Sequence, residues 1–237
     1  MTEALLLAVA AVFATAFGGL FALRYQDKLH LILGFSAGAV MAVALADLLP
    51  EALELSRPRY EGSTVTLIVG VGFFAYLLLS RVVLLHSGAE GHNHAGALGA
   101  ATLSIHSFLD GVGIGLAFRV SPRVGAVVAA AVLAHDFSDG INTVSVVLKA
   151  QSVRDRALRW LIVDAIAPLL GVASTFLFTL PRVRLGLALA LFCGFFLYVG
   201  AADLLPESHH RHPKALTGLM NVLGALAIYT AIRLASL

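Results

Sequence analysis

Charged residues are scarce in this chain of 237 residues. They make up 13% of it, about half of the roughly 25% that a soluble domain carries. Hydrophobic residues reach 59%, and the mean hydropathy is +0.91. This composition excludes an ordinary soluble domain, and it predicts an all-α polytopic membrane protein.

Cysteine and net charge are also nearly absent. Cys193 is the only cysteine, so an intrachain disulfide is excluded. The net charge of +2 is small and dispersed, which argues against nucleic acid as a partner.

No Lys or Arg precedes the first apolar run, and Glu3 stands where a signal peptide would carry positive charge. We therefore interpret this run as a first membrane helix.

Long apolar runs dominate the chain. A membrane-crossing helix needs about 20 apolar residues, and we expect eight such helices in a single transmembrane domain, 1–237. An even number of crossings places both termini on one side of the membrane. The loops on the two sides hold eight and seven Lys or Arg, which favours termini outside by one residue only. The predicted helices span, roughly, residues 3–23, 30–55, 64–86, 96–118, 123–149, 156–180, 183–206 and 214–235.

The fourth and fifth of these runs carry the same pattern, His-x-Phe-x-Asp-Gly. The first copy contains His106 and Asp110, and the second contains His135 and Asp139. Side chains four positions apart lie on one face of a helix. Each copy therefore presents an imidazole beside a carboxylate, a ligand pair suited to a divalent metal. The glycines Gly111 and Gly115 that follow the first pattern predict close contact with a neighbouring helix.

Four aspartates lie near the centres of the predicted helices, where the free-energy cost of their charge must be offset. A charged aspartate at a helix centre costs roughly 2.5–3.5 kcal/mol, so four cost roughly 10–14 kcal/mol. Protonation would neutralise the four aspartates, but protonation alone does not explain the two matched His-Asp pairs. A divalent cation explains both, and mixed N/O ligands favour Zn²⁺, Fe²⁺ or Mn²⁺ over Cu⁺. The residues of this predicted centre are His106, Ser107, Asp110, His135, Asp136, Asp139 and Asp164.

This set exceeds the four ligands of one tetrahedral ion, so two adjacent ions are a possible arrangement. Asp110 and Asp139 would then bridge the two. One ion would use His106, Asp110, His135 and Asp139, and the other Asp110, Asp136, Asp139 and Asp164, with the hydroxyl of Ser107.

Other acids and histidines lie at the predicted membrane faces. The acids would attract cations at two mouths, or they would cap and solvate helix ends. The histidines would bind metal weakly, or they are solvated loop residues. The acids are Asp47, Glu51, Asp203 and Glu207, and the histidines are His86, His92, His94, His209, His210 and His212.

A six-residue repeat links two distant helices. Ala-Asp-Leu-Leu-Pro-Glu occurs at 46–51 and again at 202–207, at the ends of helices that run in opposite directions. Together with the two His patterns, it predicts an inverted repeat in which helices 1–3 correspond to 6–8 and helix 4 to helix 5. Inverted repeats with a polar midplane site are typical of transporters. The alternative is that this hexapeptide is merely a convenient helix end.

On these motifs and the run Gly34–Gly38, nearly the whole chain resembles the ZIP (Zrt-, Irt-like protein) family of divalent metal transporters. The resemblance implies eight helices, dimers, outside termini, and metal uptake into the cytosol by alternating movement of helix bundles. By this resemblance, one metal position of the family corresponds to His106, Asp110, His135 and Asp139. The second corresponds to Ser107, Asp110, Asp136 and Asp139.

The chain departs from the family pattern at several site positions. Ser107 replaces the commoner asparagine, Leu109 and Ser138 replace prolines, and aspartates stand where glutamates are frequent. In helix 6, Ala167 occupies the position where the family often has glutamate, and Asp164 lies three residues earlier. The side chain of aspartate is shorter than that of glutamate and extends less far toward a metal ion, which leaves the number of bound ions open.

We therefore hypothesise a secondary transporter in a cell membrane, not an enzyme. It needs no cofactor, and its substrate is a divalent metal: Zn, Fe, Mn or Cd. Its other partners are the lipid bilayer and a second copy in a homodimer. The alternatives are an intramembrane metal-dependent hydrolase, disfavoured because His-Glu-x-x-His is absent, and a proton-coupled carrier of an organic solute.

Overall fold

The computed structural model describes residues 2–23, 29–89, 92–151, 153–210 and 215–234. The described elements are helices throughout. Within these described residues, eight stretches are long and apolar enough to cross a membrane, as the sequence predicts. The main helices are α1 (Thr2–Ala22), α2 (Leu29–Val43), α4 (Gly62–Ala89), α5 (His92–Val120), α6 (Pro122–Gln151), α7 (Arg154–Ser174), α8 (Arg182–Tyr198) and α10 (Ala215–Leu234).

Two of the eight spans are interrupted by a π-helical turn at the repeated hexapeptide. The turns are Ala44–Leu48 and Val199–Leu204, followed by the short helices α3 (Leu49–Ser56) and α9 (Leu205–His210). In each turn a leucine N–H donates to the carbonyl five residues earlier. The next residue is proline, which lacks an N–H and crowds the carbonyl four residues before it. The widened turn relieves that conflict, and it was not predicted from the sequence.

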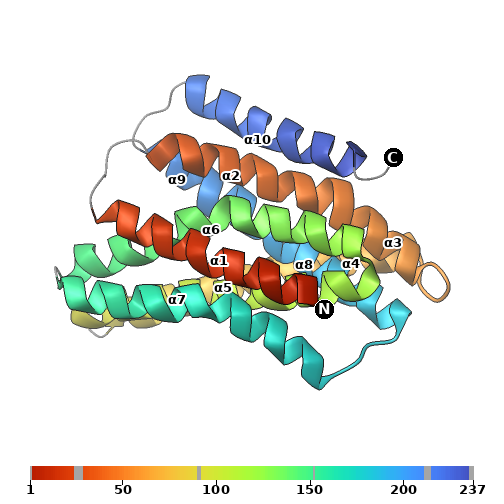
Figure 1. The fold of residues 1–237 in the computed structure, drawn as a ribbon, viewed down its shortest axis with the longest axis horizontal. Helices are drawn as coiled ribbons and strands as arrows, with labels where there is room; N and C mark the ends of the chain where they lie inside the picture. Colours follow the sequence, from red (N-terminus) through yellow and green to blue (C-terminus); the bar gives the residue numbers. More distant parts are fainter. Residues whose placement is uncertain (1, 24–28, 90–91, 152, 211–214, 235–237) are drawn as a thin grey trace.

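The helices form a bundle in which α5 and α6 pack against each other (Figure 1). Helix α1 packs on α6, and α7 packs on α5. On the other side of the bundle, α10 packs on α2 and α4 packs on α8. The start of α1 and the end of α10 lie at the same end of the molecule, whereas α3 and α9 lie at opposite ends (Figure 1). An even number of crossings requires this placement of the first and last helices.

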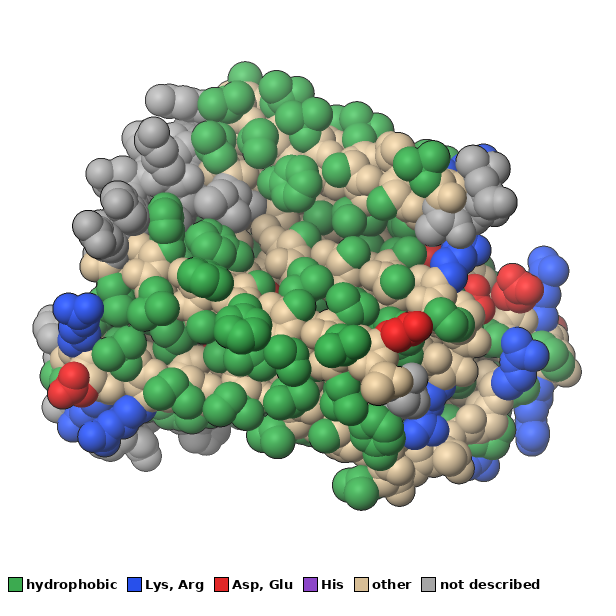
Figure 2. Space-filling view, viewed as in Figure 1, with side chains coloured by type: hydrophobic (Ala, Val, Ile, Leu, Met, Phe, Trp, Pro, Cys, Tyr) green, Lys and Arg blue, Asp and Glu red, His purple; other side chains and the backbone are tan. Residues whose placement is uncertain are grey.

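The outer face is apolar along most of its length. In Figure 2 hydrophobic side chains cover the middle of the visible face, and Lys and Arg gather at the two ends. Large apolar side chains such as Phe17, Phe74 and Leu219 are exposed on α1, α4 and α10. An exposed apolar band with charged ends is suited to lipid, so the chain is a multi-pass membrane protein.

Glycines allow the helices around the bundle centre to touch through their backbones. A Cβ on Gly111 of α5 would overlap the carbonyl of Pro168 in α7. A Cβ on Gly140 of α6 would overlap the carbonyl of Thr15 in α1. Each of these glycines directly follows the aspartate of a His-x-Phe-x-Asp-Gly pattern, so the close crossings lie beside the acids. Close contact at Gly111 was predicted from the sequence, and it is confirmed.

Candidate metal centre

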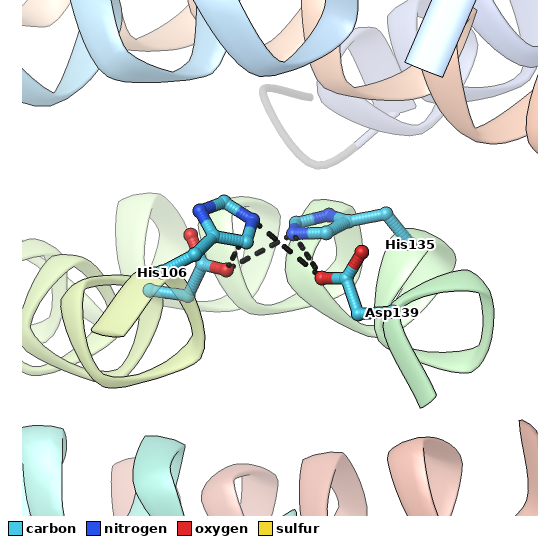
Figure 3. Close-up of side chains that lie close together, drawn as sticks. His106, His135 and Asp139 are labelled. Carbon is cyan, nitrogen blue, oxygen red and sulfur yellow. Dashed lines mark hydrogen bonds and ion pairs between the residues drawn. The ribbon is translucent and has the colours of Figure 1, made fainter. Parts of the chain in front are cut away.

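Four side chains from α5 and α6 converge inside the bundle. His106 and Asp110 lie one turn apart on α5, and His135 and Asp139 lie one turn apart on α6. Figure 3 shows the rings of His106 and His135 and the carboxylate of Asp139 directed toward one another. All four residues are buried, with at most 4% of the surface of each exposed. The packing of α5 on α6 therefore turns two local i, i+4 pairs into one cluster, which we call the His-Asp cluster.

The separations within the His-Asp cluster suit a single metal ion. The Nε2 atom of His135 lies 3.0 Å from Oδ2 of Asp110 and 3.7 Å from Oδ2 of Asp139. The Nε2 atom of His106 lies 3.2 Å and 3.5 Å from the same two oxygens. One ligand atom from each residue lies within 4.8 Å of all the others. A tetrahedral zinc with bonds of about 2.0–2.1 Å spaces its ligands about 3.3–3.4 Å apart. This spacing lies within the range of the four imidazole–carboxylate separations, 3.0–3.7 Å.

Hydrogen bonding orients the His135 ring for this role. Its Nδ1 lies 2.8 Å from the carbonyl oxygen of Ala131, which can only accept, so Nδ1 carries a proton. In the neutral ring, Nε2 then holds the lone pair, and it faces the carboxylates. The His135 ring packs edge-to-face with Phe196, and the His106 ring packs edge-to-face with Tyr76. Neither aromatic residue was identified as a site residue from the sequence.

Several polar atoms of this region have no hydrogen-bond partner among the described residues. They are Nε2 of His106, Oδ2 of Asp139 and both carboxylate oxygens of Asp136. Asp136 has no exposed surface at all. Leaving a buried polar group unpaired costs about 1–3 kcal/mol, and more when it is charged. A cation bound among these atoms would supply the missing partner.

Three residues of the second predicted set, Ser107, Asp136 and Asp164, are not members of the His-Asp cluster. Asp164 on α7 accepts a hydrogen bond from the hydroxyl of Ser107 (2.8 Å) and another from the hydroxyl of Thr143 (2.7 Å). Asp136 lies one turn from Asp139 on α6 but is not among the four converging ligands. The two-ion arrangement stays a prediction. Thr143 was missed, although its spacing of four from Asp139 and seven from Asp136 places it on the same side of α6.

The predicted mouth acids lie near the helix interruptions. Asp47 is buried in the first π-helical turn, Glu51 is half-buried in α3, and Asp203 is exposed in the second turn. Among the described residues the His-Asp cluster is the group found with metal-ligand spacing. Metal contacts at the mouths and loops stay predictions. The side chains of Glu207, His86, His92, His94, His209, His210 and His212 lie outside the described residues.

Imidazoles and acids buried together inside a multi-pass helical bundle are characteristic of membrane proteins that handle ions. The family model described as ZIP zinc transporter matches residues 89–230, which include both cluster helices. The chain belongs to the ZIP zinc transporter family. Members of this family are transporters and not enzymes, so the hydrolase alternative is set aside.

Named relatives agree with this assignment. The chain is similar to zinc transporter ZupT of Corynebacterium efficiens, with 27% identity covering 83% of this chain and 82% of the relative. It is similar to ZupT of Corynebacterium glutamicum, with 26% identity covering 91% and 93%. Zinc transporter SLC39A7 of Mus musculus is 29% identical over 56% of this chain but only 29% of its own length.

Proposed function

We propose that this protein carries divalent transition-metal ions, zinc foremost, across a membrane, and that the His-Asp cluster holds the ion in transit. The observation that carries the proposal is the convergence of four buried ligand atoms within 4.8 Å of one another. Two carboxylates balance the two positive charges of the ion, and two neutral imidazoles complete a tetrahedral N₂O₂ shell. The ion thus exchanges its water for protein ligands inside the membrane.

Zinc is favoured over other metals by the donor set and the relatives. Imidazole with carboxylate suits zinc and the neighbouring first-row ions, whereas a sulfur-rich site would suit Cu⁺. The bacterial relatives are named zinc transporters. Fe²⁺, Mn²⁺ and Cd²⁺ are the competitors to test against zinc in one uptake assay.

The helix crossings support the inverted repeat as the basis of transport. Gly38 lies nine residues before Asp47, and Gly194 lies nine residues before Asp203. A Cβ on Gly38 would overlap the backbone of α10, and a Cβ on Gly194 would overlap that of α4. The pairs α1–α6 and α7–α5 correspond in the same way. Two structurally related halves around a polar midplane site suit alternating access, with the site open to one side at a time.

The family resemblance supports a proposal for the sidedness and the assembly of the transporter. We propose uptake into the cytosol by a homodimer with outside termini. The even number of spans and the one-residue excess of loop Lys and Arg agree with that orientation. Labelling of a cysteine introduced near either terminus, in intact cells against opened cells, tests the sidedness.

Zinc uptake into liposomes tests the function. Purified protein in liposomes loaded with a fluorescent zinc chelator is expected to admit zinc faster than liposomes without protein. Elemental analysis of the purified protein is expected to find about one zinc ion per chain at the His-Asp cluster. Uptake equal to that of empty liposomes would overturn the proposal. A metal-free protein that moves an organic solute together with protons would establish the remaining alternative.

Zinc is also expected to stabilise the folded protein. A ligand that binds only the native state, at about 100 times its dissociation constant, adds about 2.7 kcal/mol to the free energy of unfolding. Thermal unfolding in detergent, with zinc against a chelator, measures this gain. A protein with both His106→Ala and His135→Ala should show almost no gain, since half of the ligand shell is gone. An equal gain in that variant would place zinc elsewhere.

A further inference from the structure

A second polar group lies beside the His-Asp cluster and joins three helices. The carboxylate of Asp164, on α7, is fully buried and accepts one hydroxyl hydrogen bond on each oxygen. The donor on α5 is Ser107, and the donor on α6 is Thr143. Both hydroxyl residues have no exposed surface. The three side chains therefore form a closed hydrogen-bonded bridge, which we call the Asp164 bridge.

The bridge is built on the same two helices that carry the metal ligands. Ser107 directly follows His106, and Thr143 lies one turn beyond Asp139. Any rotation or sliding of α7 against α5 or α6 would break one of two short hydrogen bonds to a buried carboxylate. Such bonds are strong because the acceptor carries charge. The bridge thus ties the register of α7 to the positions of the ligands.

We infer that Thr143 is a positioning residue for metal transport, which acts by holding the Asp164 carboxylate between the two ligand helices. This inference rests on the proposed function. Each oxygen of Asp164 has a second lone-pair position, so the two hydroxyls fix its direction without exhausting its capacity to accept. A fixed carboxylate beside the cluster provides negative charge next to the path of the cation. Without Thr143, one oxygen would lose its donor and the carboxylate would be free to turn.

Thr143 is well suited to isosteric substitution. Valine keeps the shape of threonine but removes the donor, and serine keeps the donor but removes a methyl group. Partners that orient metal-site residues change affinity or activity by about 10–100-fold when they are removed. We expect Thr143→Val to lower the ratio of maximal zinc uptake to KM about 10-fold, and Thr143→Ser to stay within about twofold of wild type.

The experiment measures zinc uptake by these variants into liposomes loaded with the fluorescent zinc chelator. The optical absorption of Co²⁺ bound at the His-Asp cluster is the second readout. Thr143→Val should leave the tetrahedral Co²⁺ spectrum unchanged, which shows that the cluster is intact. Thr15→Val is the matched control, because Thr15 is also fully buried but donates to Ala11 of its own helix. The double variant Thr143→Val with Asp164→Ala should be no slower than Asp164→Ala alone, since both act through one carboxylate.

The inference is overturned if Thr143→Val transports like wild type, or if Thr143→Ser is impaired as much as Thr143→Val. It is also overturned if the two substitutions of the double variant act independently. Each of these results is read against wild-type protein that does transport zinc. Failure of wild-type transport would instead overturn the proposed function, so the two failures are distinguishable.

Discussion

Replacing Asp110 and Asp139 together by alanine is expected to abolish zinc uptake, with a loss of about 100-fold or more. These carboxylates are the two anionic ligands of the His-Asp cluster, and each lies 3.0–3.7 Å from both imidazoles. Without them an ion in the membrane interior keeps its full double charge, and burying an unpaired charge is very costly. Two neutral imidazoles cannot replace the water that the ion must lose.

The measurement is the initial rate of zinc uptake into liposomes at several zinc concentrations. Asp110→Ala and Asp139→Ala should each lower the initial uptake rate at least about tenfold. Their effects should not be additive, because both carboxylates bind the same ion. Asp155→Ala is the matched control, since Asp155 is an exposed acid at the start of α7. Its uptake should equal that of wild type. Undiminished transport by the double variant would remove the His-Asp cluster from the path of the ion.

The His-Asp cluster could be predicted from the sequence because its geometry is mostly local. A spacing of four residues puts His106 over Asp110 and His135 over Asp139 on any helix. The repetition of the pattern on two consecutive spans then needed only one further step, which is that neighbouring helices pack face to face. The eight spans were predictable for a similar reason, since the length of an apolar helix must match the thickness of the hydrocarbon core of the bilayer.

What the sequence left open depends on contacts between distant residues. Nothing local reveals that Ser107 and Thr143 direct their hydroxyls to Asp164, because three helices must first take their register. The π-helical turns were equally hidden. Their cause, a proline within a span, is visible in the sequence. A proline is equally compatible with a regular kink or with the end of a helix, so the sequence does not indicate which of these forms.

Gly111→Ala is expected to destabilise the protein by about 3 kcal/mol, the upper part of the range for overpacking. The new methyl group would overlap the backbone of α7 at Pro168, and the facing Gly171 already lies against the backbone of α5. Neither side can yield by changing a rotamer, because both surfaces are main chain. Thermal unfolding in detergent should show a melting temperature lower by roughly 6–12 °C, the shift expected for a chain of this size.

The substitution should also weaken zinc binding, because Gly111 directly follows Asp110 and any separation of α5 from α7 moves that ligand. Gly70→Ala is the matched control: it lies in α4 with open space around it, so the same methyl group meets nothing. Its unfolding free energy should stay within about 1 kcal/mol of wild type. If both alanine variants unfold alike, the helices do not touch at Gly111. The glycine after each site acid would then serve some purpose other than bringing α7 and α1 against the ligand helices.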